Sequence, residues 1–120
     1  MLGNKILKEM QRRMVKNFLD IIILAELRNA NPIGGYDIMD FVQRKFGFIV
    51  SSGTVYSMLY SMERKGLVKC AGIQTKRVYV LTEKGAEKIV ALLNSKEEIQ
   101  RFMGVCIGAV DYSFFRSMSL

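Results

Sequence analysis

The sequence predicts a mainly α-helical fold with a small two-stranded wing, and three observations in residues 51–82 carry that prediction. A helical stretch with a polar outer face begins at a serine pair and ends at Gly66. Two short alternating segments follow, at residues 67–70 and 77–81, joined by a basic turn. Thr82 then stands where it can cap another helix. This order of elements is that of a winged helix-turn-helix, here followed by a C-terminal helix.

The first half of the chain is predicted to form three helices. Residues 4–17 place apolar side chains at helical spacing between lysines and arginines, which indicates a basic amphipathic helix. It could be a packing helix, a membrane-surface helix or an arm that touches DNA, and packing is favoured because the segment lacks Trp and Phe. Residues 18–27 are apolar nearly all round; strand propensity competes there, but the period of the flanking residues favours a central helix. Residues 29–35 are predicted to be a turn, and residues 36–46 a helix that ends at Gly47.

The second half begins with the predicted recognition helix, residues 51–65, with a serine as N-cap. Val55, Leu59 and Met62 form its apolar stripe, so the opposite face is polar. After the wing, a helix capped by Thr82 runs to about residue 93. Ser95 to Glu98 matches a capping box, and a last helix is expected from about residue 96 to residue 118.

Charge and residue types limit the possible functions. The chain has 120 residues and a net charge of +7, concentrated in residues 1–20 and 51–82, so an acidic partner is expected, nucleic acid before anionic membrane. Two cysteines and no histidine exclude a zinc site built from one chain and the usual Ser-His or Cys-His nucleophiles. No cofactor or metal is predicted, and an enzyme is the least favoured class. No apolar run could span a membrane and no signal peptide is recognisable, so a cytoplasmic protein is expected.

Four motifs, in order, resemble the PadR-like family of transcriptional regulators. They are Pro32 to Ile38 (PIGGYDI), Ser52 to Tyr56 (SGTVY), Met62 to Val68 (MERKGLV) and Tyr79 to Gly85 (YVLTEKG). The resemblance runs over about residues 18–88. It implies a homodimeric winged-helix DNA-binding protein, usually a repressor of a nearby promoter. The chain departs from the family at Ser52, where a proline is usual, in its longer basic N-terminal extension and in its short C-terminal part.

The candidate DNA contacts follow from the order of helix and wing. Helix 51–65 would enter the major groove of double-stranded DNA, and the wing, residues 69–80, would lie on the backbone. The predicted contacts are Ser52, Thr54, Tyr56, Ser57, Tyr60, Ser61, Arg64, Lys76 and Arg77. Arg64 comes late in the helix and is expected to reach only the backbone. An architectural protein that coats or bends DNA without reading its sequence is the alternative, and a winged fold used for protein interaction is a third reading.

The C-terminal helix is predicted to form a homodimer. Its apolar residues repeat in a heptad seam and extend beyond what one small domain could cover. The predicted interface residues are Ile99, Phe102, Met103, Cys106, Ile107, Val110 and Phe114. The domains would therefore be residues 1–94, with the basic helix and the winged helix, and residues 95–120 for dimerisation. Cys106, at the midpoint of such a helix, could approach its symmetry mate, although a reduced thiol is the commoner state in cytosol. Whether a small-molecule effector exists is left open.

Overall fold

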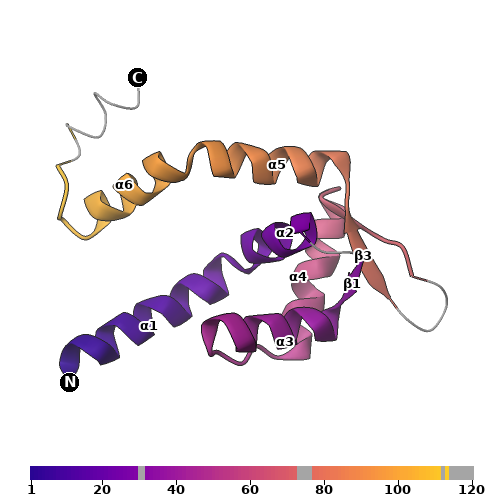
Figure 1. Ribbon diagram of the computed structural model, residues 1–120, viewed down its shortest axis with the longest axis horizontal. Coiled ribbons are helices and arrows are strands. Elements are labelled where there is room, and N and C mark those ends of the chain that lie inside the picture. Colours follow the sequence, from indigo (N-terminus) through magenta and orange to yellow (C-terminus); the bar gives the residue numbers. More distant parts are fainter. Residues whose placement is uncertain (30–31, 73–76, 112, 114–120) are drawn as a thin grey trace. The chain divides into compact units, whose positions relative to one another are not determined.

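The computed structural model describes residues 1–29, 32–72, 77–111 and 113 (Figure 1). The chain divides into two compact units, Met1–Ile89 and Val90–Leu120. The elements in chain order are α1 (Leu2–Asn17), α2 (Leu19–Asn29), β1 (Ile33–Gly34), α3 (Gly35–Phe46), α4 (Ser52–Arg64), β2 (Val68–Cys70), β3 (Val78–Leu81), α5 (Glu83–Asn94) and α6 (Lys96–Cys106).

The core of the first unit forms around α2. Leu19, Ile23 and Leu24 are completely buried, which confirms that the apolar segment is a central helix and not a strand. The inward stripe of α4 packs on it, and the inward stripe of α3 packs against α4. They consist of Ile38 and Val42 from α3, and of Val55, Leu59 and Met62 from α4. This burial fixes which face of α4 remains in contact with solvent.

The sheet has three strands in the described part of the chain, in the order β1–β3–β2. The β2–β3 hairpin is the predicted wing, with Val68 opposite Leu81. The turn predicted for residues 29–35 is wrong at its end, because Ile33 and Gly34 form β1 and pair antiparallel with Tyr79 and Val78. Two residues are too few to show the alternation by which a strand is recognised in sequence.

Helix ends in the first unit follow their local sequence signals. Ser51 is the N-cap of α4, and its side-chain oxygen accepts a hydrogen bond from the Thr54 N–H at 3.1 Å. Gly47 ends α3 with φ +76°. Gly66 also has φ +76°, and its N–H donates to Glu63 O, so the chain leaves α4 abruptly. Gly85 N–H donates to Thr82 Oγ1 at 3.0 Å, which confirms the predicted cap of α5.

The second unit differs from the sequence prediction at both ends of α6. Ser95 forms no side-chain cap, so the predicted capping box is absent; its own N–H instead donates to Ala91 O, which continues the preceding helix. The predicted helix to residue 118 is also wrong, because α6 ends at Cys106. Gly108 has φ +78° and donates to Val105 O, while Ala109 donates to Gly104 O. These two bonds are a Schellman motif, which stops the helix.

Candidate nucleic-acid interface

The first half of α4 presents a polar surface to solvent. Thr54 and Ser57 are exposed, and Ser52 and Ser61 are half-buried. An open hollow follows this face of the helix, lined by Ser51, Gly53, Thr54, Ser57, Met58 and Ser61. The N–H groups of a first helical turn carry partial positive charge, which favours a phosphate or another acceptor. Small hydroxyl side chains beside an exposed helix start suit close approach to a nucleic acid.

Tyr56 lies on the inner edge of this face and packs against the start of α3. A Cβ atom added at Gly35 would stand 2.4 Å from the Tyr56 ring, so only a glycine fits under the ring in this arrangement. The Tyr56 ring also meets the Tyr36 ring edge-on, with centroids 6.1 Å apart. The structure therefore gives Tyr56, a predicted DNA contact, a packing role between α3 and α4. Gly35 was not among the predicted site residues, because the sequence does not reveal which side chain will pack against a glycine at the start of a helix.

Tyr60 and Arg64 lie farther along the exposed side of α4. The Tyr60 side chain is 42% exposed, and the Arg77 guanidinium lies 5.5 Å from its ring centroid. Arg64 is exposed in the last turn of the helix. The tyrosine and the base of the wing thus form one continuous surface.

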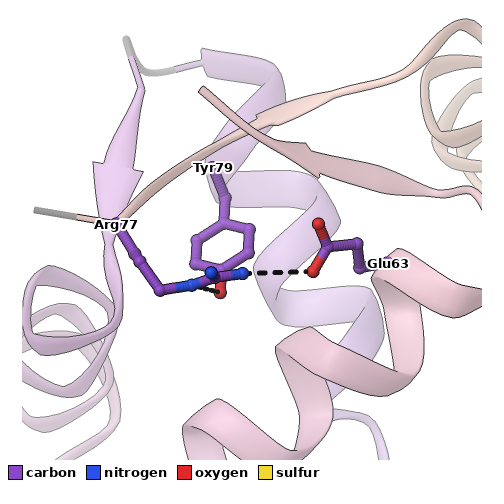
Figure 2. Close-up of polar contacts among 3 residues, drawn as sticks. All are labelled: Glu63, Arg77 and Tyr79. Atoms are coloured by element: carbon purple, nitrogen blue, oxygen red, sulfur yellow. Dashed lines mark hydrogen bonds and ion pairs between the residues drawn. The ribbon is translucent and has the colours of Figure 1, made fainter. Parts of the chain in front are cut away.

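Arg77 joins the wing to the end of α4 (Figure 2). Its Nε donates to Tyr79 Oη at 3.0 Å, and one terminal nitrogen lies 3.3 Å from Glu63 Oε1. The Arg77 side chain remains 47% exposed, so it can still meet solvent or a ligand. Arg77 was predicted from sequence, but neither of these partners was. The partner Glu63 could not be predicted, because it is 14 positions away. The other predicted wing contact, Lys76, lies outside the described residues.

Tyr79 anchors this network from the inside of the sheet. Its side chain is completely buried, whereas the alternation of β3 by itself does not say which face of the sheet is covered. Burial raises the pKa of Tyr79 above its ordinary value, and the hydrogen bond from Arg77 opposes that rise. The same hydrogen bond raises the pKa of Arg77. The phenol therefore stays neutral and the guanidinium charged at physiological pH.

Comparison with known proteins places this geometry in a family. The family model described as the transcriptional regulator PadR-like family matches residues 23–91, more than half of the 120 residues. The chain belongs to the PadR-like family of transcriptional regulators. No curated protein matches the chain. The four motifs that suggested this family all lie within the matched residues.

Solved structures similar to this PadR-like chain share its winged-helix fold. A PadR family transcription regulator from Clostridium difficile R20291 is 26% identical, with TM-score 0.66 over 76% of this chain and 99% of that chain. A transcriptional regulator from Clostridium thermocellum is 23% identical, with TM-score 0.65 over 77% and 92% of the two chains. A PadR family regulator from Eggerthella lenta DSM 2243 is 18% identical, with TM-score 0.67 over 92% and 99%.

The C-terminal segment of this PadR-like protein exposes apolar side chains. Ile99 is 49% exposed, Phe102 45% and Ile107 69%, and Cys106 is also exposed. Met103 and Val110 are half-buried, and Phe114 lies outside the described residues. Val110 is not on α6 as predicted: a Cβ added at Gly104 would stand 2.8 Å from its Cγ2, so the chain folds back there. Cys106 is the last residue of α6 and not the midpoint of a long helix, which removes the geometry that would have brought it close to its symmetry mate.

The helices of the PadR-like chain are short or amphipathic. Among the residues that the structure describes, no helix is both long enough and apolar enough to cross a bilayer.

Proposed function

We propose that this protein is a homodimeric regulator of transcription, acting as a repressor, which inserts α4 into the major groove of double-stranded DNA and rests the wing on the backbone. The observation that carries the proposal is the division of α4 into a completely buried stripe and an exposed hydroxyl-rich face. Val55 and Leu59 hold the helix in the core, while Thr54 and Ser57 are exposed to solvent. Because its target would be promoter DNA, we expect it to act in the cytoplasm.

The proposed contacts divide into two groups by chemistry. Hydroxyl groups at the start of α4 can donate to and accept from base edges, and its first-turn N–H groups can bind phosphate. Arg64, Lys76 and Arg77 would contact phosphates, which position a protein on DNA without reading its sequence. Arg77 reaches the surface from a fixed place, since Glu63 and Tyr79 hold it.

Dimerisation is supported by apolar surface in both units. In the second unit Val90 and Leu93 of α5 are 46% and 41% exposed, in addition to the exposed side chains of α6. In the first unit Ile6 and Leu7 of α1 are 52% and 57% exposed. Apolar side chains exposed in this way would be removed from water in a dimer, which favours association. Two copies would present two recognition helices, as a palindromic site requires.

The first test is selection of bound fragments from random double-stranded DNA at moderate salt, followed by a footprint on the best fragment. Sequence-specific enrichment with two protected half-sites supports the proposal. Equal binding of every fragment would favour the architectural alternative, and no binding even at low salt would favour a protein-interaction module. Binding upstream of a reporter promoter should lower its transcription; a rise would exclude the repressor role.

The dimer is tested with the chain shortened after Ser95. We expect sedimentation to show a monomer with lower DNA affinity, because single wings cannot span two half-sites. If the shortened chain remains a tight dimer, the interface does not lie in the removed residues. Phe102→Ala in the full chain, which keeps α6, is the milder variant that separates a weakened interface from a failure to fold.

A further inference from the structure

The helix α1 carries a second basic surface, outside the recognition helix and the wing. Lys5, Lys8, Arg12 and Lys16 are all exposed. At about 100° per residue they share an arc of about 80° on the helix. The apolar residues Ile6, Met10 and Met14 lie on roughly the opposite side. The basic face therefore stays free even when the apolar face is covered.

This basic face adjoins the segment that leads into α4. The Arg12 guanidinium lies 5.5 Å from the Phe48 ring centroid, in the link between α3 and α4. Arg12 and Lys16 share a hollow of about 370 Å³ with residues 47–50, and the next residue is the N-cap of α4. Val15, which is only 5% exposed, packs α1 against the body at this point. Two cations are thus held close to the start of the recognition helix.

We propose that the basic face of α1 binds the DNA phosphate backbone next to the stretch contacted by the start of α4. This inference rests on the proposed function, which it extends from two DNA-binding elements to three. From Lys5 to Lys16 the face is about 17 Å long, at about 1.5 Å per residue. That length corresponds to about five base pairs, since each strand carries one phosphate per about 3.4 Å.

DNA suits this face better than an anionic membrane for two reasons. The helix has neither Trp nor Phe on its apolar side, where interfacial helices usually carry aromatic anchors. Its cations also lie beside residues 47–50, which lead directly to Ser51, the N-cap of α4. A membrane helix would need no such proximity to α4.

The test compares two double variants with equal loss of charge. Lys8→Gln with Lys16→Gln removes two cations of the face, keeps helix propensity and leaves the Arg12–Phe48 contact intact. Lys88→Gln with Lys96→Gln removes two exposed cations elsewhere and is the matched control. Affinity for the selected DNA is measured at several salt concentrations, together with hydroxyl-radical footprints. Circular dichroism checks that each variant keeps its helices.

We expect the α1 variant to lose a distinct stretch of backbone protection while the protection by α4 and the wing remains. The slope of log affinity against log salt should fall by about 0.9 for each phosphate that the variant no longer binds. The control should keep the wild-type footprint and slope. Equal slopes in wild type and α1 variant, or an equal change in the control, would overturn the inference while leaving the proposed function intact.

Two further outcomes distinguish the alternatives. Wild-type protein that binds no DNA at any salt would overturn both proposals. Flotation with vesicles containing phosphatidylserine tests the membrane reading directly. If the α1 variant loses vesicle binding but keeps its DNA footprint, the basic face serves a membrane and not DNA.

Discussion

The guanidinium of Arg77 lies 3.3 Å from the carboxylate of Glu63, so an ion pair ties the base of the wing to the last turn of α4. The two residues are 14 positions apart, and Gly66 turns the chain sharply between them. The pair gives the wing a fixed place beside the recognition helix. Since both side chains are partly exposed, the ion pair contributes more to the orientation of the wing than to the stability of the fold.

The Glu63–Arg77 pair should therefore show a small coupling that depends on salt. In a double-mutant cycle of Glu63→Ala and Arg77→Ala, followed by urea unfolding, we expect a favourable coupling at low salt that disappears near about 1 M salt, where the Debye length is about 3 Å. A coupling that persists at high salt would show a pair more shielded from solvent than this exposure indicates.

Replacing Lys76 and Arg77 with Ala should weaken binding to all duplexes alike. Both residues are proposed to act through charge, so the salt slope should fall by about 0.9 for each phosphate that is no longer bound. Titration of specific and unrelated duplexes at several salt concentrations measures this. Glu63→Ala is a useful companion, because it releases Arg77 without removing its charge. If the slope of log affinity against log salt is unchanged in the double variant, the wing does not contact DNA phosphates.

Replacing Ser57 with Ala, or Tyr60 with Ala, should change which sequences are preferred. A base contact discriminates between sequences, by about 1–3 kcal/mol where it is bidentate and by less for a single hydroxyl, whereas a phosphate contact does not discriminate. Repeating the fragment selection with each variant measures the shift. Ser95→Ala is the control, because Ser95 lies in the second unit and its side chain forms no helix cap. Equal loss on every sequence would assign these side chains to the backbone.

Gly85→Ala should destabilise the fold although alanine favours helices. A Cβ added at Gly85 would stand 2.0 Å from Leu67 O, and backbone atoms cannot give way as a flexible side chain can. We expect a loss of about 1–3 kcal/mol in the free energy of unfolding, as for other overpacked sites. Urea unfolding measures it. Gly3→Ala, where a Cβ meets nothing within 4 Å, should show no such loss.

Stability should fall at alkaline pH in part because of Tyr79. Its pKa is raised in the folded protein from the ordinary value of 10.0, chiefly by burial. The folded state therefore holds the phenol proton more tightly than the unfolded state, so this contribution is complete below about pH 10 and is lost as pH rises through the folded pKa. Urea unfolding from about pH 8 to about pH 11.5 should show a shallower decline for Tyr79→Phe. Tyr36→Phe, at a ring that is 69% exposed, controls for loss of a hydroxyl; if both variants decline alike, Tyr79 is not the source.

The site could be predicted from sequence only as far as local signals reach. The polar face of α4 follows from helical period and the position of Ser51, and the basic hairpin follows from alternation and charge. The Glu63 partner of Arg77 and the glycine under Tyr56 could not be predicted, because both depend on chain segments brought together by folding. DNA contact and dimerisation remain predictions, both from the sequence and from the structure.

The sequence by itself determined the helices of the first unit and the wing, because their signals lie within a few residues of each element: the period of apolar residues, the caps and glycines such as Gly47. It also determined the family, because the four motifs can be read in the sequence in their order. Tertiary structure alone decided the pairing of β1 with β3 and the burial of Tyr79. A two-residue strand exists only once another strand offers hydrogen bonds. The end of α6 at Cys106 has a local cause, because Gly108 at positive φ stops the helix although the heptad pattern continues. The chain then folds back and places Val110 against Gly104.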